Sequence, residues 1–387
     1  MEDSFIATLK STLTIQRWNL QPKVETWVEA ENAMVVAHFA YGIAKGQQIS
    51  DDQITHLLFR ILLKSLNKHY TTDISHFVTD ELRNNYKSIW EKVIDNYANQ
   101  VSKLLPREIS SFIKNYLVYQ ATYGENIEFG FPKLEVKDRA RFEDIILFCQ
   151  NRAAIQEFEI NAKIYNGYYR EVEEQTNKLD SMFLKYQKIM NDNKEYFQAI
   201  TRLKYIRRWN NTNRFMSSSV LGHTYVVSVL TLILSLAEKK DVNFIRDALL
   251  KAMFHDVPES MTGDIITPVK EELKRHNPNL VSEIEKKLTK EKFTDKAPQG
   301  IQNIINRHKL FEELSNDVIN SESSLVKDCD QLALMVECLS EKEAKVEICE
   351  MEKTYLKYYQ KLSNSEWPKV REFLGTLDGR WLNAQLK

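Results

Sequence analysis

Four side chains in the second half of the chain have the types and spacing of a divalent-metal site. His223 lies in one apolar stretch, the pair His255-Asp256 ends a second about thirty residues later, and Asp330 lies in a third. Imidazole nitrogens with carboxylate oxygens suit a borderline or hard divalent cation. Apolar residues around Asp330 follow a helical repeat, so its carboxylate falls on or beside a core-facing stripe, where a charge is costly unless it is paired or bound to metal. The four residues therefore predict one metal centre.

Each of these residues taken alone has an ordinary explanation. A helical histidine is usually exposed or hydrogen-bonded in a core, and a His-Asp dipeptide often arises by chance. Glu259 and Asp264 follow the pair in "HDVPESMTGDIITPVK". They would simply cap the next helix, since "SMTGD" is typical of a turn and Asp is a good N-cap. Only the combination of these residues favours a catalytic metal site.

The elements that carry these residues have counterparts in the first half of the chain. The segment "STLTIQRWNLQPKVETWVEAENAMVVAHFA" from Ser11 resembles "TRLKYIRRWNNTNRFMSSSVLGHTYVVSVL" from Thr201, with Arg17 opposite Arg208 at an offset of 191 and no gap. Residues 142–159 resemble 324–341, and 179–190 resemble 352–363. Unrelated amphipathic helices would not explain an unbroken register. We expect two homologous helical domains, 1–190 and 191–387, joined by a long polar helix within 170–200.

Comparing the two copies distinguishes residues that the fold requires from residues that only the chemistry requires. Residues that folding requires should occur in both copies, whereas residues that only the chemistry requires can be lost from one. The candidate site residues differ in the first copy: His223 is opposite Asn32, His255 opposite Lys64, Asp256 opposite Ser65, Glu259 opposite Lys68, and Asp330 opposite Gln150. The apolar pattern survives in both copies. The first copy is therefore expected to keep the fold and to lack the metal ligands.

Composition favours an all-α protein. The 387 residues include only 10 Gly and 8 Pro, which are low against usual usage of roughly 7% and 5% and leave few turns for a sheet protein. The net charge of −1 shows no basic excess, so we expect no nucleic-acid partner. The N-terminus lacks the pattern of a secretion signal, and the four Cys have no CxxC spacing, which favours buried thiols and a cytoplasmic protein.

The longest apolar stretch is "VVSVLTLILSLA", residues 226–237. A transmembrane helix needs about 20 apolar residues, so this stretch is too short to span a bilayer. We expect a buried core helix and no membrane partner.

The order of the motifs resembles the HD-domain metal-dependent phosphohydrolases. "RLKYIRRW", "GHTYVV", "FHDVPESMTGDIITPVK" and "SLVKDCDQL", over roughly 195–345, are similar to the bacterial 5′-deoxynucleotidases of that superfamily. The resemblance implies an all-helical fold that pairs into a homodimer and removes phosphate from deoxyribonucleoside 5′-monophosphates with a divalent cation. The tandem arrangement of this chain departs from that family pattern. We therefore expect a pseudo-dimer with one active site, in which the degenerate first copy replaces the partner subunit and the protein can be a monomer.

The resemblance also implies roles for single residues. The metal ligands would be His223, His255, Asp256 and Asp330, for one ion of Mn, Co, Zn, Ni, Fe or Mg. Glu259 and Asp264 would activate water and protonate the leaving group, in an order that the sequence leaves open. The substrate would be bound by Arg208 at the phosphate, by Trp209 beside the sugar, where it excludes a 2′-hydroxyl, and by Thr267 and Lys270.

Two features limit what the resemblance implies. The family commonly has an acidic residue just before the first histidine, whereas this chain has Gly222, so the substrate preference stays open. Arg17 and Trp18 persist in the copy without ligands, so a structural role for Arg208 and Trp209 is also open.

Three alternatives remain. The substrate could be a nucleotide phosphodiester or triphosphate. A second metal could bind His276 and His308, although "KRHNPN" and "NRHKLF" are more typical of exposed helix ends. The protein could also be a non-catalytic nucleotide-binding regulator whose first copy is the binding module.

Overall fold

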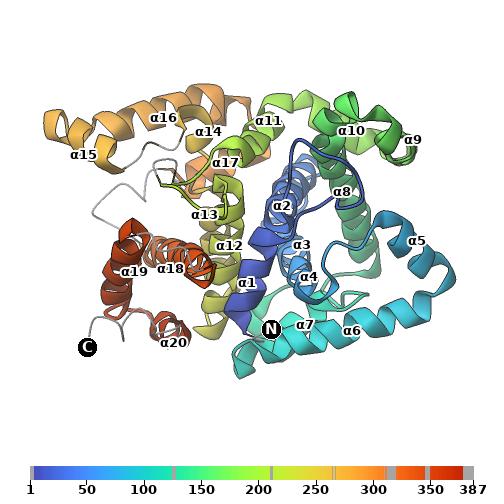
Figure 1. Cartoon of the computed structure of the whole chain (residues 1–387), viewed down its shortest axis with the longest axis horizontal. Coiled ribbons are helices and arrows are strands. Elements are labelled where there is room, and N and C mark those ends of the chain that lie inside the picture. The colour runs from blue at the N-terminus through green and yellow to red at the C-terminus, as the bar shows by residue number, and fades with distance from the viewer. Residues whose placement is uncertain are drawn as a thin grey trace. The chain divides into compact units, whose positions relative to one another are not determined.

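A computed structural model of the chain describes residues 4–123, 128–209, 212–263, 265, 267–308, 310–311, 320–344 and 349–377. The fold is all-α, as predicted (Figure 1). Within these residues there is no β-strand, and the extended backbone is limited to two isolated bridges, Gln16 with Val28 and Arg207 with Ser219.

The chain divides into two compact units, Met1–Phe197 and Gln198–Lys387. The division falls within one helix and lies a few residues after the boundary that the repeat predicted. The helices of the first unit are α1 (Phe5–Thr14), α2 (Glu29–Gly46), α3 (Asp51–Lys64), α4 (Lys68–Thr71), α5 (His76–Asn85), α6 (Lys87–Lys103), α7 (Arg107–Leu117), α8 (Val136–Ile164), α9 (Asn166–Met182), α10 (Leu184–Asp192) and α11 (Lys194–Arg202), of which α11 continues past the division.

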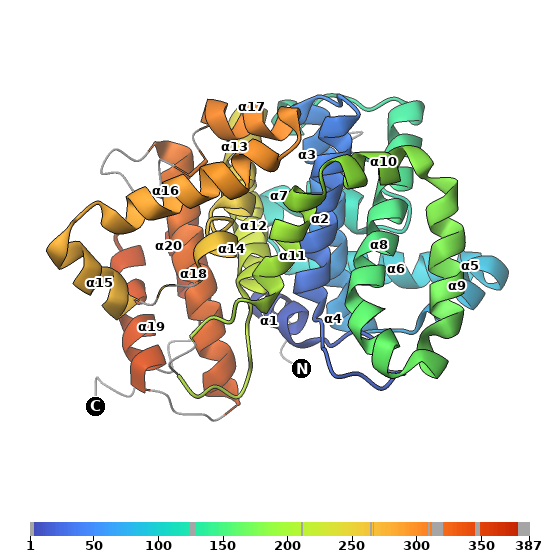
Figure 2. The same ribbon diagram turned by 90° about the horizontal axis from the view of Figure 1, so that it is seen from above.

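The first unit is built around α2, whose residues from Glu29 to Ala44 are all buried. It packs against α3 and α8, and Figures 1 and 2 both show α2 beside α8. The aromatic rings of Phe59, Phe112 and Tyr116 contact one another where α3 meets α7. Burial of such apolar side chains is the main favourable term in folding, so these ring contacts stabilise the packing of α3 against α7.

The second unit has the same kind of centre. Its helices are α12 (Val220–Ala237), α13 (Val242–Phe254), α14 (Glu259–Thr262), α15 (Thr267–His276), α16 (Leu280–Lys292), α17 (Gln299–His308), α18 (Ser321–Glu343), α19 (Cys349–Leu362) and α20 (Pro368–Thr376). Helix α12 packs against α13 and α18, and these two also pack against each other.

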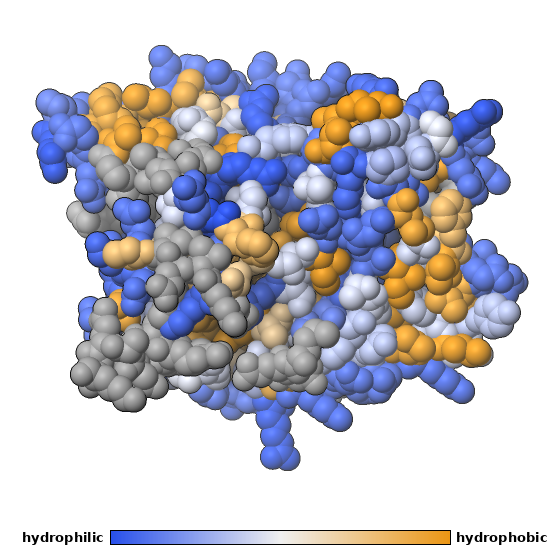
Figure 3. Space-filling view, in the orientation of Figure 1, coloured by the Kyte–Doolittle hydropathy of each residue, from blue (hydrophilic) through white to orange (hydrophobic). Residues whose placement is uncertain are grey.

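Helix α12 contains the predicted core helix. It is long and apolar enough to cross a membrane by length and composition, but it is 100% buried inside the protein. Its 18 residues therefore form the core of the second unit. On the face shown in Figure 3, hydrophilic residues predominate outside the grey atoms, and apolar residues form separate patches.

Several helices of the two units are related by the predicted offset of 191 residues. Adding 191 to the first and last residue numbers of α2, α4 and α5 gives the first and last residue numbers of α12, α14 and α15. The two isolated bridges are also 191 residues apart, as are Trp18 and Trp209, which both have a positive φ (61° and 58°). The local backbone thus repeats where the sequence repeats.

Two predictions about local structure were wrong. The segment 170–200 is not one helix, because the chain leaves helical geometry at Phe183 and Asn193 and runs as α9, α10 and α11. The thiols are all free, but only Cys149, Cys329 and Cys338 are buried, whereas Cys349 is exposed at the start of α19.

Candidate metal centre and active site

Three helices of the second unit position the predicted metal ligands. Ser219 caps α12 by accepting a hydrogen bond from the backbone N–H of Gly222, which places His223 in the first turn of that helix. Helix α13 ends at Phe254, so His255 and Asp256 occupy the tight turn before α14. Asp330 lies on α18. Because α12, α13 and α18 pack against one another, these residues are brought into one region.

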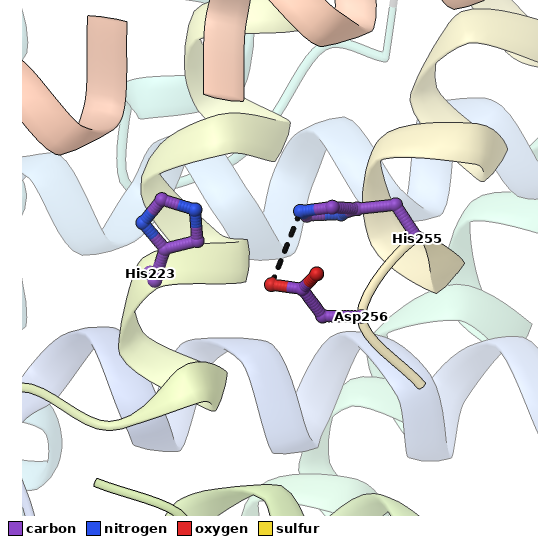
Figure 4. Close-up of side chains that lie close together, drawn as sticks. All are labelled: His223, His255 and Asp256. Carbon is purple, nitrogen blue, oxygen red and sulfur yellow. Dashed lines mark ion pairs between the residues drawn. The ribbon is translucent and has the colours of Figure 1, made fainter. Parts of the chain in front are cut away.

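His223, His255 and Asp256 converge on one point. One ligand atom from each lies within 4.8 Å of the others, and Figure 4 shows the side chains facing a common space. His255 Nε2 is 3.2 Å from Asp256 Oδ2, yet neither atom makes a hydrogen bond although both are buried. Buried polar atoms that make no hydrogen bond are costly, and a divalent cation between these two would bind both. These residues therefore fit a metal ion.

Hydrogen bonds on the far side of each imidazole fix which nitrogen faces that point. His223 Nδ1 donates to Glu337 Oε1 at 3.0 Å, and His255 Nδ1 donates to the carbonyl of Ala252 at 2.7 Å. When the rings are neutral, both Nε2 lone pairs are left for a metal. Metal-binding histidines are commonly oriented by partners of this kind.

Asp330 contacts the cluster but lies outside its tightest group. Its Oδ1 atom is 2.7 Å from His223 Nε2, and its side chain is 35% exposed while that of His223 is fully buried. The Asp330 carboxylate thus lies on the solvent-facing side of the cluster. To bind a metal at this point, Asp330 would have to exchange its contact with His223 Nε2 for one with the ion.

The charges of the cluster are strongly coupled. Burial acts to lower the pKa of His255, but the Asp256 carboxylate outweighs it and raises that pKa to about 9. Burial acts to raise the pKa of Asp256, but His255 beside it holds the pKa well below its usual range. The pKa of Asp330 is also lowered, because the hydrogen bond with His223 outweighs burial. Both carboxylates are therefore ionised at neutral pH, as metal ligands must be.

Glu337 is a central residue that the sequence analysis missed. It lies on α18 seven residues after Asp330, on the same helix face, and its side chain is only 2% exposed. Besides His223, its carboxylate accepts hydrogen bonds from Trp209 Nε1 at 2.7 Å and Ser218 Oγ at 3.1 Å. Burial acts to raise its pKa, but Arg208 and His223 hold it well below its usual value. The signal was present, because Glu157 is opposite Glu337 in the register that pairs Gln150 with Asp330, where both pairs are 180 residues apart.

Arg208 lies between this carboxylate and the cluster of candidate metal ligands. Its Nε atom is 3.4 Å from Glu337 Oε1, and its Nη1 atom is 3.8 Å from Asp256 Oδ2. The side chain is only 13% exposed. A guanidinium held in this way next to the cluster can bind phosphate oxygens without a large rearrangement.

Trp209 is fixed by the scaffold. Its indole N–H donates to Glu337, its backbone adopts a left-handed φ of 58°, and the Arg214 guanidinium lies 6.0 Å from its ring centre. In the first unit, Trp18 donates to Glu157 at 2.6 Å in the same manner. The contacts of Trp209 therefore repeat in the copy that lacks the ligands, and a structural role accounts for them.

The remaining predicted residues are placed less completely. Glu259 begins α14 just after the His-Asp turn, and its charge contributes to a raised pKa of Arg208, which opposes the effect of burial. Asp264 lies outside the described residues, and Thr267 is described only as the first residue of α15. Lys270 Nζ is 4.0 Å from Glu285 Oε1 on α16, and no described contact joins it to the cluster.

The histidines considered for a second metal do not join this cluster. His276 is exposed and lies 3.5 Å from Glu272. His308 is not an exposed helix end as expected, since its side chain is 13% exposed and lies 3.4 Å from Asp247. In the part of the chain that the structure describes, one group of three candidate ligands is found, that of His223, His255 and Asp256.

The second unit is similar to proteins of a known family. The family model of the 5′-deoxynucleotidase YfbR-like proteins matches residues 195–378, which spans most of the second unit. A 5′-deoxynucleotidase of Yersinia pestis (strain Pestoides F) is 31% identical over 156 residues, which are 38% of this chain and 73% of the relative. A 5′-deoxynucleotidase of Yersinia pseudotuberculosis serotype O:1b (strain IP 31758) gives the same figures. The chain therefore belongs to the YfbR-like 5′-deoxynucleotidase family of nucleotide phosphohydrolases.

Proposed function

We propose that the second unit hydrolyses the phosphomonoester of nucleoside 5′-monophosphates, with a preference for deoxyribonucleotides, to give a nucleoside and phosphate. The observation that carries this proposal is the convergence of His223, His255 and Asp256 within 4.8 Å, beside the buried guanidinium of Arg208. The names of the relatives and the family support the choice of substrate.

One divalent cation would be held by His223, His255, Asp256 and Asp330. When bound, such an ion polarises a phosphate oxygen and lowers the pKa of a water molecule. Its identity stays open among Mn, Co, Zn, Ni, Fe and Mg, because nitrogen and carboxylate ligands suit several of them.

The chain's own residues would do the rest of the chemistry. Arg208 would hold the phosphate and balance its charge in the transition state. One carboxylate of Glu259 and Asp264 would take a proton from the attacking water, and the other would give a proton to the departing 5′ oxygen as its bond to phosphorus breaks. Thr267 and Lys270 complete the proposed substrate-binding set, and Trp209 would pack against the sugar where a 2′-hydroxyl has no room.

We also propose that the first unit is a degenerate copy of the second and takes the place of a partner subunit. The matching helix bounds and the repeated contacts of Trp18 and Trp209 support this. The chain would then act in the cytoplasm as a monomer, with neither a nucleic-acid nor a membrane partner. Sedimentation at micromolar concentration should give the mass of one chain, and a stable dimer would contradict the pseudo-dimer.

The proposed activity is tested by phosphate release from a panel of deoxyribonucleoside and ribonucleoside 5′-monophosphates with Mn, Co or Mg. We expect release that depends on the cation, disappears in the Asp256→Ala variant and is weaker for ribonucleotides. If metal binds but no monophosphate is hydrolysed, the substrate assignment is wrong, and di- and triphosphates, cyclic nucleotides and a purely regulatory role are the next to test.

The raised pKa of His255 predicts how metal binding depends on pH. A group with a pKa of about 9 is protonated at neutral pH in the metal-free protein, and a protonated imidazole cannot bind a metal. The pKa of His223 is also raised, because its hydrogen bonds with Asp330 and Glu337 outweigh burial. Each bound cation must therefore displace at least one proton, so we expect affinity to rise at least about tenfold per pH unit between pH 7 and 8 and to level off above pH 9.

Competition between the protein and a chelator of known affinity for Mn would measure this slope. His308→Asn is the matched control, because that histidine lies beside Asp247 and outside the cluster. It should leave the slope unchanged. A wild-type affinity that is constant from pH 7 to pH 8 would contradict the assignment of His255 as a ligand.

A further inference from the structure

The first unit contains a cavity at the positions that correspond to the metal centre of the second unit. The cavity has a volume of about 670 Å³, within the range of about 300–1,000 Å³ that ligand pockets span. Its lining comes from residues 17–21, from α2, α3, α4, α5 and α8, and from neighbouring segments of this unit. A unit that had only a scaffold role would be expected to fill such a space with side chains.

The five residues that stand opposite the site residues of the second unit all line this cavity. They are Asn32, Lys64, Ser65, Lys68 and Gln150. In the second unit these positions carry two histidines and three carboxylates, whereas here they carry three neutral polar groups and two amines. The charge of the site is thus inverted from negative to positive. The site of the second unit would need a metal cation to bind phosphate. The cavity of the first unit has two lysines that could bind phosphate directly.

Neither Lys64 nor Lys68 forms an ion pair with a carboxylate among the described residues, although Glu29, Asp73 and Asp80 also line the cavity. Burial, which is the largest cause, and the Arg60 guanidinium together lower the pKa of Lys64 to about 7, while Glu143 is the opposing charge. The other charges that act on Lys64, Arg83 and Lys68, are also positive. An ammonium held among cations in this way is stabilised by a bound anion.

The polar scaffold of the active unit is retained around these lysines. Arg17 donates through Nε to Glu157 at 2.8 Å and lies 3.0 Å from Glu29, and Asn32 also donates to Glu157. Arg17 and Trp18 both line the cavity. The guanidinium and the indole therefore have the anchors that Arg208 and Trp209 have in the second unit.

Other lining residues suit the rest of a nucleotide. Trp90 offers an apolar ring, and Asn67 and Asn151 offer amide groups at the cavity wall. Stacking on aromatic rings and hydrogen bonds to side-chain amides are the usual means by which proteins hold a base.

We propose that this cavity is a second, non-catalytic site that binds a nucleoside 5′-monophosphate, with the phosphate on Lys64 and Lys68 and the base toward Trp18 or Trp90. The site does not hydrolyse its ligand. Asn32, Ser65 and Gln150 replace the metal ligands, and the ammonium of Lys64 repels a divalent cation. The site therefore holds nucleotide without turnover, and it does not depend on the chemistry proposed for the second unit.

The test uses the full chain with Asp256→Asn, stripped of metal by a chelator, so that turnover in the second unit cannot interfere. Isothermal titration with a nucleoside 5′-monophosphate should show one binding event per chain. Lys64→Glu should weaken it at least about tenfold, since a charge-assisted contact to phosphate is lost and a repulsion is added. Lys64→Met removes the charge and keeps the length in case the Glu variant does not fold. Lys103→Glu is the matched control, because Lys103 is exposed and does not line the cavity.

Hydrogen exchange locates the bound ligand. We expect nucleotide to slow exchange over 51–71, which include Lys64 and Lys68, more than over 242–262 in the second unit. Inorganic phosphate tests the phosphate contacts, and an unphosphorylated nucleoside tests the base and sugar contacts. Both should bind more weakly than the monophosphate.

Three results would overturn the proposal. Binding that Lys64→Glu and Lys64→Met leave unchanged would exclude the lysine site. Equal binding of the unphosphorylated nucleoside would exclude phosphate recognition, and equal binding of inorganic phosphate would exclude the nucleotide. Phosphate release in the second unit can fail in the assay above without affecting any of these outcomes.

Discussion

Asp256→Asn is expected to reduce metal-dependent phosphate release by at least about 10³-fold, since the several kcal/mol that a bound cation supplies to the transition state would be lost. Asn keeps the shape of the side chain but lacks the charge. The Asp256 carboxylate is a candidate ligand 3.2 Å from His255 Nε2 and also lies 3.8 Å from the Arg208 guanidinium. Its removal should therefore impair both the metal and the phosphate contacts.

Elemental analysis after dialysis should show the cause, with metal content falling from one ion per chain toward none. Asp295→Asn is the matched control, because Asp295 is about half exposed and lies near Lys290 rather than in the cluster. It should keep full activity. If Asp256→Asn retains release within tenfold of the wild type, Asp256 is not an essential ligand.

Glu337→Ala is expected to lower the free energy of unfolding of the second unit by about 3–5 kcal/mol, the usual cost of removing one partner of a buried ion pair. Glu337 is buried between Arg208 and Arg214, at 3.4 Å from each. Without it two guanidinium groups, the Trp209 indole and the His223 Nδ1–H lose an acceptor. Urea unfolding followed by circular dichroism would measure the loss.

The milder Glu337→Gln variant separates folding from metal binding. Gln still accepts one hydrogen bond but no longer holds His223 with a charge, so metal affinity should fall about 10–100-fold, the usual effect of a partner that orients a ligand. Glu157→Gln is the matched control in the first unit. It should destabilise that unit and leave metal content unchanged, and a similar loss of metal in both variants would contradict a local role for Glu337.

The sequence predicted that the candidate ligands His223, His255 and Asp256 lie together, because the repeat acts as an internal control. His223, His255 and Asp256 are weak signals separately, but all three are replaced in the first copy while the helix pattern persists. The all-α fold was predicted from the scarcity of Gly and Pro, and the buried α12 was predicted from one apolar run. Both follow from backbone and burial preferences, which are properties of local sequence.

The same comparison concealed Glu337. The comparison singles out residues that differ between the copies, whereas a carboxylate occurs in both, as Glu157 and Glu337, so the carboxylate beside His223 did not stand out. The breaks at Phe183 and Asn193 carried no Gly or Pro signal, and tertiary packing decides them. The outward position of Asp330 also depends on how α18 is rotated against α12, which the helical pattern alone does not define.

Helix α12 has a consequence for synthesis of the protein in the cell. It is as apolar as a membrane span, and one of the helices that cover it, α18, begins at Ser321, some 84 residues after α12 ends at Ala237. A ribosome adds roughly 5–20 residues per second, so an incompletely covered α12 would wait on the order of 4–17 s for this partner. During that interval α13, the next helix along the chain, can already pack against α12, whereas α18 cannot. The nascent second unit is thus exposed to chaperones and membrane-targeting factors for longer than the finished protein would suggest.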